Sequence, residues 1–327
     1  MNVNKHVLLL LICLFFGKTY TEIEKGKLAQ MKAFYKDLPV LVTGGAGFIG
    51  SQVTKTLVQL GANVTVMDNL STGNIKNLDN VISNITFIEK SITNFDACLE
   101  ATKDKAIIFH LAAFISVPES LKNPALCHKT NIDGTFNLLE ASRINNVKKF
   151  IFSSSAAVYG PATAICKEDM PCNPQSPYGT SKLVGELFCK QYADNFALGT
   201  IVLRYFNVFG DRQNPNGAYA AVVAKFMYQM KHNLPITIFG DGLQTRDFIP
   251  VEKVAEANLT VAMLDQLLMN GQIFNIATGK SINLFELIDT LKAKFPDYTG
   301  KILFGPSRPG DIKNSSADCE KYNSLSV

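Results

Sequence analysis

Hydrophobic and polar positions follow two rhythms from residue 39 onward, short apolar runs and longer stretches with helical spacing. The helical stretches cover 49–60, 131–143 and 177–195, where apolar residues recur every three or four positions. The apolar runs have the length and the bounding turn residues of buried strands: 39–43, 63–67, 85–88, 106–110, 149–153 and 200–205. Strands that are apolar on both faces and alternate with helices predict an α/β fold, a Rossmann-type doubly wound parallel sheet with a smaller C-terminal α/β lobe.

The regular alternation breaks after residue 207, where Pro, Gly and Asn become frequent. A helical pattern over 251–268 then indicates a helix that returns to the main sheet. We therefore predict a Rossmann domain made of residues 38–206 plus about 238–268. The remaining segments are predicted to form a substrate-binding lobe: 207–237 and 269–327.

Residues 1–37 precede this pattern and contain an apolar run at 7–16. The run is too short to cross a bilayer as a helix, so we expect no integral membrane span. Its length suits the core of a signal peptide, but residues 19–21 offer only a poor cleavage site. We interpret 1–37 as a leader. A chain start at Met31 and a leader docked on the protein surface are the alternatives.

Composition narrows the partners and the compartment. Apolar residues make up 47% of the chain and charged residues 18%, as in globular proteins. The net charge of +4 gives no reason to expect a nucleic-acid partner. The seven cysteines are dispersed, without a CxxC pair or a spacing typical of metal sites. We therefore expect unpaired thiols, a reducing and cytoplasmic location, and no bound metal.

The first candidate binding site is a glycine-rich turn, Thr43-Gly-Gly-Ala-Gly-Phe-Ile-Gly50, between a predicted strand and a predicted helix. Its three spaced glycines allow a tight turn, close approach of a pyrophosphate and close packing of helix on sheet. The helix N-terminus adds free N–H groups for the phosphates. Asp68 ends the next strand and can accept hydrogen bonds from the ribose hydroxyls, while its charge repels a 2′-phosphate. The pattern therefore predicts NAD rather than NADP.

The second candidate site combines Tyr178 and Lys182 with the serines at 153–155 that end a predicted strand. The i, i+4 spacing places the phenol and the ammonium on one helix face. A phenol with a pKa of about 10 is a poor base at neutral pH. A neighbouring ammonium and a nicotinamide cation both favour the phenolate and lower that pKa. With the glycine turn upstream, these residues predict hydride chemistry in which Tyr178 handles the proton.

These motifs and their order make the chain resemble the extended short-chain dehydrogenase/reductases, and within them the UDP-sugar 4-epimerases. The resemblance runs from about Val40 to Asp318. Beyond the glycine turn and Ser176-Pro-Tyr-Gly-Thr-Ser-Lys182, it rests on these segments: Asp68-Asn69, His110-Leu-Ala-Ala113, Asn131, Ser153-Ser-Ser-Ala-Ala-Val-Tyr-Gly160, Arg204-Tyr-Phe-Asn-Val-Phe-Gly210, Asp247-Phe-Ile-Pro-Val251 and Arg308-Pro-Gly-Asp311. It implies an NAD-dependent isomerase that works through a transient 4-keto sugar.

The resemblance also implies a role for each matching residue. Tyr178 would take the proton of the sugar 4-hydroxyl and later return it, Ser155 would bind the same oxygen, and Lys182 would hold the nicotinamide ribose. The implied cofactor contacts are Gly44, Gly47, Phe48, Ile49, Gly50, Asp68, Asn69, Ser91, Ile92, Ala112, Ala113, Asn131, Tyr178 and Lys182. The implied contacts to the UDP-sugar are Ser116, Ser155, Tyr178, Asn207, Ala221, Arg246, Arg308 and Ser315.

Two stretches narrow the reaction and the substrate. Related dehydratases and decarboxylases carry an acid just after the serine or threonine at this strand end, but Ala156 and Ala157 follow Ser155, which favours simple epimerisation. In related epimerases a tyrosine at the position of Ser315 excludes N-acetylated sugars, and a serine leaves room for them. Residues 213–221 resemble the subgroup that prefers such sugars. We therefore predict interconversion of UDP-GlcNAc and UDP-GalNAc, with UDP-Glc and UDP-Gal as a second pair.

Two departures from the family pattern leave alternatives open. Lys90-Ser91-Ile92 stands where the family has Gly-Asp-Ile beside the adenine, so a hydroxyl or the backbone would make that contact. The chain stops at Val327, where family members continue, so we expect a truncated substrate lobe. The alternatives are a UDP-uronate epimerase, a net nucleotide-sugar oxidoreductase and a non-catalytic NAD-binding protein. Helices 131–143 and 177–195 correspond to dimer helices of related enzymes, so we expect a homodimer.

Overall fold

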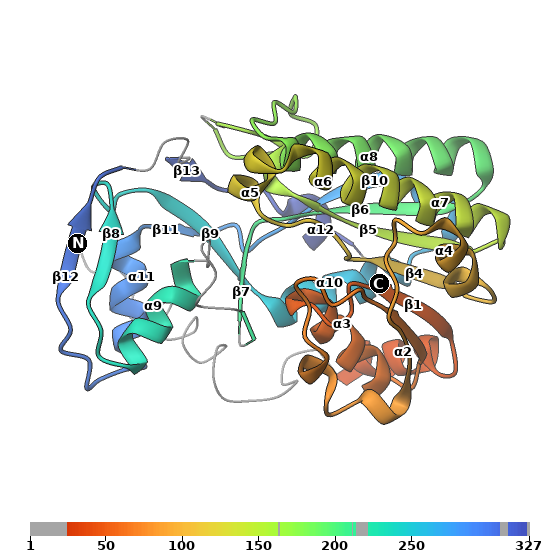
Figure 1. Cartoon of the computed structure of the whole chain (residues 1–327), viewed down its shortest axis with the longest axis horizontal. Coiled ribbons are helices and arrows are strands. Elements are labelled where there is room, and N and C mark those ends of the chain that lie inside the picture. The colour runs from red at the N-terminus through yellow and green to blue at the C-terminus, as the bar shows by residue number, and fades with distance from the viewer. Residues whose placement is uncertain (1–24, 163, 211, 214–221, 308–312, 326–327) are drawn as a thin grey trace.

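A large parallel sheet with helices on both faces forms the body of the protein, and a smaller lobe lies beside it (Figure 1). The computed structural model describes residues 25–162, 164–210, 212–213, 222–307 and 313–325. The strand order is β10-β6-β5-β4-β1-β2-β3, which confirms the predicted doubly wound Rossmann-type sheet. Its strands are β1 (Pro39–Thr43), β2 (Asn63–Met67), β3 (Ile85–Ile88), β4 (Ile107–His110), β5 (Lys149–Ser155), β6 (Gly199–Tyr205) and β10 (Asn270–Ile276).

Helices cover the two faces of this sheet in separate layers (Figure 1). One face carries α4 (Phe95–Thr102), α7 (Gly134–Ile144) and α8 (Pro177–Phe196), with the shorter α5 (Val117–Lys122) and α6 (Pro124–His128) and a π-helical turn at Lys129–Asp133. The other face carries α2 (Lys25–Tyr35), α3 (Phe48–Gln59) and α10 (Val251–Ala262). Single 3₁₀ turns lie at Ile75–Leu78, Ile82–Asn84, Ala156–Val158 and Gln266–Leu268.

Burial on both faces explains why the strands read as continuous apolar runs. On β1, Val40 and Val42 pack into the core beneath α3 and α10, whereas Leu41 packs into the core beneath α4 and α7. All three side chains are fully buried. Each contributes about 1.5–3 kcal/mol through the burial of its apolar surface. The alternation of polar and apolar residues seen in half-exposed strands is therefore absent here.

The leader assigned to residues 1–37 is wrong in its second half. Helix α2 packs against the sheet layer, with Met31 and Tyr35 fully buried in the core. The Tyr35 hydroxyl donates a hydrogen bond to the carbonyl of Leu259 in α10 at 2.7 Å. Residues 25–37 therefore belong to the Rossmann domain. The apolar run at 7–16 lies outside the described residues. In the part of the chain that the structure describes, no helix is long and apolar enough to cross a membrane.

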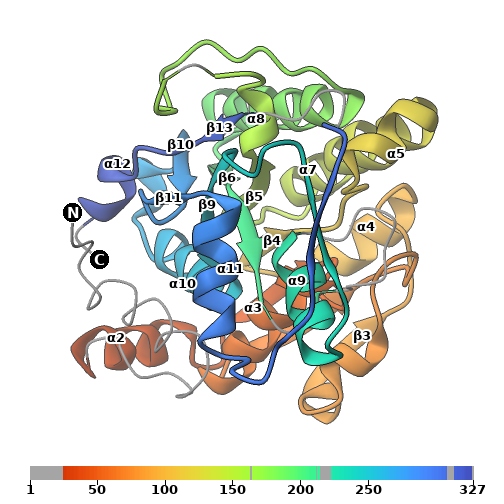
Figure 2. The ribbon, with the colours of Figure 1, turned by 90° about the vertical axis from the view of Figure 1, so that its left-hand side faces the viewer.

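Within the described residues, the smaller lobe, which faces the viewer in Figure 2, contains two small sheets and two helices. One sheet is built around β9 (Thr245–Pro250) and also contains β7 (Asn207–Phe209), β11 (Ser281–Ile282) and β13 (Asn314–Ser315). The other pairs β8 (Ile236–Phe239) with β12 (Ile302–Gly305), and the helices are α9 (Val222–Lys231) and α11 (Leu284–Lys292). A last short helix, α12 (Glu320–Asn323), packs against β10 of the large sheet.

The predicted boundaries between the two lobes are wrong in two places. Strands β8 and β9 belong to the small lobe, although residues 238–250 were assigned to the Rossmann domain. Strand β10 pairs in parallel with β6 at the edge of the large sheet, although residues from 269 onward were assigned to the small lobe. Short strands of similar composition occur in both lobes. Their pairing partners decide where they lie, and periodicity does not reveal partners.

Candidate active site

The carboxyl ends of three neighbouring strands bring the main candidate residues together. Thr43 ends β1, His110 ends β4 and Ser155 ends β5, and Thr43 pairs directly with His110 in the sheet. The chain continues from β1 to β2 on one side and reaches β4 and β5 on the other. This reversal is the switch point at which open α/β sheets bind ligands.

The glycine turn after β1 leaves no room for side chains at two positions. Gly44 has φ +69°, and a Cβ there would lie 2.6 Å from the backbone nitrogen of Ala112. A Cβ on Gly50 would lie 2.1 Å from the carbonyl oxygen of Gly44. Gly47 caps α3 without a side-chain hydrogen bond, so the N–H groups of the first turn, at Phe48 and Ile49, have no side-chain cap. This close-fitting cradle at a helix N-terminus suits a pyrophosphate.

Asp68 stands beside this cradle at the end of β2. Its buried carboxylate accepts hydrogen bonds from the backbone nitrogens of Ala46, at 2.9 Å, and Leu70, at 2.8 Å. Burial raises the pKa of Asp68, and these two hydrogen bonds oppose the shift. The neighbouring Asn69 is exposed, and its side-chain oxygen accepts from the Ser71 nitrogen at 3.1 Å. The carboxylate therefore fits the place of a ribose partner next to the glycine turn.

The two residues predicted to contact the adenine, Ser91 and Ile92, are only partly accessible to a ligand. The Ser91 hydroxyl is half-buried and shares a 2.9 Å hydrogen bond with Thr93. Ile92 is 4% exposed, and its side chain packs into the core below α7. Its carbonyl accepts a hydrogen bond from Asn137 at 3.1 Å. The contact proposed for Ile92 would therefore come from its backbone, not from its side chain.

The N-terminus of α8 fixes the Tyr178–Lys182 pair. Ser176 caps the helix by accepting from the Gly179 nitrogen at 3.1 Å, so Tyr178 lies in the first turn and Lys182 one turn later. The Lys182 ammonium donates to the carbonyl of Ser153 at 2.8 Å and lies 6.0 Å from the centre of the Tyr178 ring. The Ser155 side chain lies close enough to Tyr178 to lower the pKa of its phenol. The predicted Ser–Tyr–Lys constellation is thus assembled at the end of β5.

The electrostatics of this constellation follow mainly from burial. Burial lowers the pKa of Lys182 to about 8 and raises the pKa of Tyr178, while the Ser155 hydroxyl favours the phenolate and works against the rise in the Tyr178 pKa. Burial next to the Lys182 cation also lowers the pKa of His110 to about 3. His110 is therefore neutral, and its ring nitrogens lie 2.8 Å from the Thr43 hydroxyl and 2.9 Å from the Thr135 hydroxyl.

Sequence reasoning assigned no structural role to two residues that hold the constellation in place. The buried Ser120 hydroxyl accepts from the Tyr178 backbone nitrogen at 3.3 Å and donates to the Val117 carbonyl at 2.6 Å. His110 links β1 to α7 through its two threonine partners. These contacts join segments far apart in the chain, and no spacing in the sequence signals them.

Asn131, which was predicted to contact the cofactor, makes several hydrogen bonds within the protein. Its side-chain oxygen accepts from the Phe114 nitrogen at 2.7 Å, and its amide donates to the Phe114 carbonyl at 3.0 Å and to the Ser181 hydroxyl at 2.9 Å. The side chain therefore holds the loop after β4 against α8. That loop contains the half-buried Ala112 and Ala113, and it ends at Ser116. Ser116 caps α5, where its hydroxyl accepts from the Glu119 nitrogen at 3.2 Å.

The predicted substrate contacts that the structure describes in the small lobe meet around β9. Asn207, at the start of β7, donates to the Asp247 carbonyl at 3.0 Å. Arg246 precedes Asp247 on β9, and Ser315 on β13 pairs with Arg246 in the parallel register. Ala221 and Arg308 lie outside the described residues. Within the described ranges, no three His, Cys, Asp or Glu side chains gather in a way that could hold a metal ion.

The sheet, the glycine cradle, the carboxylate beside it and the Ser–Tyr–Lys constellation define a short-chain dehydrogenase/reductase of the extended type. The family described as "NAD dependent epimerase/dehydratase family" matches residues 40–277, and the chain belongs to this family. NAD is therefore its cofactor. The sequence resemblance to the UDP-sugar 4-epimerases is confirmed.

Named relatives agree with this assignment. The UDP-glucose 4-epimerase of Mycolicibacterium smegmatis is 37% identical over 283 residues, which cover 85% of this chain and 89% of that protein. A UDP-N-acetylglucosamine 4-epimerase from Methanobrevibacter ruminantium, solved with UDP-N-acetylmuramic acid, has a TM-score of 0.85 and 40% identity, covering 89% of this chain and 93% of that one. A UDP-glucose 4-epimerase from Thermotoga maritima, solved with UDP-glucose, has a TM-score of 0.81 and 39% identity, covering 87% and 91%.

Proposed function

We propose that the protein interconverts UDP-GlcNAc and UDP-GalNAc by epimerisation at C4, with UDP-Glc and UDP-Gal as a second pair. The observation that carries this proposal is the Ser155–Tyr178–Lys182 constellation beside the cofactor cradle. A protein that only binds NAD does not require a phenol whose base form is stabilised by a buried ammonium.

In the proposed reaction, one residue handles the proton in both directions. Tyr178 accepts the proton of the sugar 4-hydroxyl as C4 is oxidised, and it returns the proton when the 4-keto sugar is reduced on its other face. Ser155 donates a hydrogen bond to the same sugar oxygen. Lys182 keeps its positive charge near the phenol and favours the phenolate. Because the two half-reactions are nearly mirror images, a single acid–base residue suffices.

The residues of the cradle fit NAD. Gly44, Gly47 and Gly50 would accommodate the pyrophosphate at the N-terminus of α3, and Asp68 would accept hydrogen bonds from the adenosine ribose. Lys182 would bind the nicotinamide ribose. When bound, NAD supplies the acceptor and the later donor of the hydride. The protein's part is to align the sugar C4 with it and to move the proton.

The surroundings of Tyr178 favour epimerisation over elimination or decarboxylation. Ala156 and Ala157 form a 3₁₀ turn directly after Ser155 and offer no acidic group. Among the described groups that shift the pKa of Tyr178 there is no carboxylate: burial, Ser155 and Cys127 account for the shift. Loss of water or of a carboxylate from the sugar would need an additional acid or base near the phenol.

The assay for this function is incubation of the purified protein with UDP-GlcNAc, UDP-Glc and UDP-glucuronate in separate reactions, followed by NMR of the sugar. The C4 epimer of UDP-GlcNAc without accumulation of NADH supports the proposal. Stoichiometric NADH would instead indicate a net oxidoreductase. A product from UDP-glucuronate alone would assign the chain to uronate epimerisation, and no product from any sugar would leave a binding protein.

Ser315→Tyr is expected to separate the two substrate pairs. Ser315 is small and half-buried, and its β13 position lies directly alongside Arg246, which is proposed to bind the diphosphate. A phenol ring there would occupy the space proposed for the N-acetyl group. We expect kcat/KM for UDP-GlcNAc to fall roughly 10–200-fold, while kcat/KM for UDP-Glc changes little. Ser315→Ala, which adds no volume, is the control. Equal losses for both sugars would reject the size argument.

We further propose that the protein forms a homodimer through α7 and α8. Phe136 on α7 and Leu187 on α8 expose 45% and 58% of their surface, apolar area that contact with a second copy would bury. Leu187→Glu is expected to convert a dimer to a monomer in light scattering, and a monomeric wild-type protein would reject the proposal.

A cytoplasmic location is also proposed, because the cysteines that the structure describes are all unpaired.

A further inference from the structure

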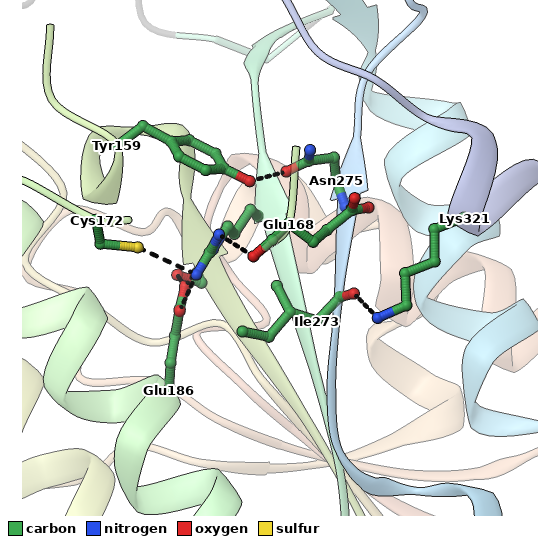
Figure 3. A network of polar contacts seen from close by, with 9 residues as sticks. Tyr159, Glu168, Cys172, Glu186, Ile273, Asn275 and Lys321 are labelled. Atoms are coloured by element: carbon green, nitrogen blue, oxygen red, sulfur yellow. Dashed lines mark hydrogen bonds and ion pairs between the residues drawn. The ribbon is translucent and has the colours of Figure 1, made fainter. Parts of the chain in front are cut away.

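A buried ion pair connects α8, the helix that carries Tyr178 and Lys182, to β6 (Figure 3). Arg204 on β6 donates from Nε to Glu186 Oε1 at 2.9 Å and from Nη2 to Glu186 Oε2 at 2.7 Å. Both side chains are only 3% exposed. This fork-to-fork geometry fixes the orientation of the two side chains as well as their separation. Glu186 projects from α8, the helix that also carries Tyr178 and Lys182.

The pair is connected to the end of β5. The Ser154 hydroxyl donates to Glu186 Oε1 at 2.5 Å. Ser153 and Ser155, the neighbours of Ser154 on β5, contact Lys182 and Tyr178 of the same helix. Three consecutive residues of β5 thus contact three successive turns of α8: Ser155 contacts Tyr178, Ser153 contacts Lys182 and Ser154 contacts Glu186. Glu186 is the member of this series that no proposed catalytic step uses.

Arg204 is also held from its other side. Its guanidinium lies 4.7 Å from the centre of the Tyr159 ring. Its Nη1 donates to the Glu168 carbonyl at 3.2 Å, and its Nη2 contacts the Cys172 sulfur at 3.3 Å. The pair is therefore anchored to β6 and to the loop after Tyr159 before it reaches α8. A buried ion pair is often no more stabilising than apolar residues of the same size, so its geometry is the better guide to its role.

We propose that Glu186 and Arg204 are positioning residues for the reaction, because their paired charges fix the rotation of α8 against β5 and so hold Tyr178 at Ser155 and Lys182 at the Ser153 carbonyl. The proposal rests on the epimerase function put forward above. A helix free to rotate by a few degrees about its axis would move both the phenol and the ammonium away from their partners on β5.

The pair also affects the charge of Lys182. The titratable groups that face its ammonium come from α8, α6 and β4: Tyr178, Glu186, Cys189, Cys127 and His110. Glu186 acts to raise the pKa of Lys182 against the effect of burial. Removing the carboxylate alone leaves an uncompensated Arg204 cation and disfavours the ammonium. Removing the guanidinium alone leaves the Glu186 anion and favours it.

The test compares Glu186→Gln and Arg204→Gln in the full-length enzyme. We expect kcat for UDP-GlcNAc to fall on the order of 100-fold in each variant, with KM nearly unchanged. In the wild type, activity should decline as pH rises above the Lys182 pKa of about 8. This alkaline decline should move to lower pH in Glu186→Gln and to higher pH in Arg204→Gln. Shifts in opposite directions are not expected from a general loss of stability.

The control is Lys190→Gln, which breaks the exposed Lys190–Asp194 ion pair on the same helix and should leave kcat and the pH profile unchanged. If the Glu186 and Arg204 variants kept wild-type kcat, or if their pH profiles moved together, the positioning role would be rejected. Should Glu186→Gln fail to fold, Ser154→Ala is the substitute, because it removes only the hydroxyl that bonds Glu186. It is expected to lower kcat with KM unchanged, and wild-type kcat would count against the proposal.

A readout independent of turnover separates this proposal from the epimerase assignment. The Tyr178 phenol can be titrated by ultraviolet difference spectra of the NAD-loaded protein, with Tyr178→Phe subtracted. Glu186→Gln should titrate at higher pH than wild type, because the displaced or deprotonated Lys182 no longer favours the phenolate. An inactive wild type with this shift would overturn the epimerase function alone. An active wild type without it would overturn the positioning role alone.

Discussion

Tyr178→Phe is expected to lower kcat for UDP-GlcNAc by about 10²–10⁴-fold, the range typical for loss of a general acid–base group. The substitution removes only the hydroxyl next to Ser155 and leaves the ring beside the Lys182 ammonium. Without that hydroxyl, the group proposed to take the proton of the sugar alcohol is lost. Both directions of the reaction should therefore slow by the same factor.

The measurement is single-turnover and steady-state kinetics in both directions, together with the amount of NAD released on denaturation. NAD content should stay at the wild-type level, because Lys182 and the glycine turn remain intact. Tyr228→Phe is the matched control, since Tyr228 is 37% exposed on α9 in the small lobe and the centre of its ring lies 4.4 Å from that of His232. A Tyr178→Phe enzyme that retained more than a tenth of wild-type kcat would assign the proton transfer to another group.

The parts of the fold that could be predicted are those in which local pattern and tertiary environment agree. β1, β2 and β3 were predicted at the bounds that the structure shows, because each is mainly apolar and ends at glycine or at a polar residue, although only β1 and β2 are largely buried. The glycine turn and the Tyr178–Lys182 pair could be predicted from the sequence equally well. Their chemistry depends on short fixed spacings, i to i+3 and i to i+4, that local structure enforces.

What could not be predicted depends on partners distant in sequence. Strand β10 joins β6 at the sheet edge and α2 buries Met31 in the core, yet nothing local distinguishes these segments from small-lobe strands or from a leader. The site shows the same limit. Arg246 and Ser315 were identified separately, and only the β9–β13 register places them side by side. Arg204 belongs to one of the motifs identified in the sequence, but the motif alone could not predict its buried ion pair with Glu186 on α8.

Gly50→Ala is expected to abolish NAD binding and, with it, activity. Gly50 lies in the first turn of α3, where a Cβ would sit 2.1 Å from the Gly44 carbonyl oxygen and 2.9 Å from the Gly45 Cα. These are backbone atoms, so no side-chain rotation relieves the overlap. Either the helix N-terminus or the turn must shift, and the turn is itself confined, because Gly44 is packed against the Ala112 backbone. A pyrophosphate cradle displaced in this way loses the close approach on which binding depends.

The expected cost to folding is about 1–3 kcal/mol, as for other overpacked sites, so the variant should still fold and the loss of cofactor can be measured directly. NAD content and calorimetric titration with NAD are the readouts, with thermal unfolding to check the fold. Gly47→Ala should have an intermediate effect, because its Cβ would be 3.1 Å from the Gly44 oxygen. Gly26→Ala in α2, with no atom within 4 Å of the added carbon, is the inert control. A folded Gly50→Ala protein with full NAD content would mean that the cofactor does not lie on this turn.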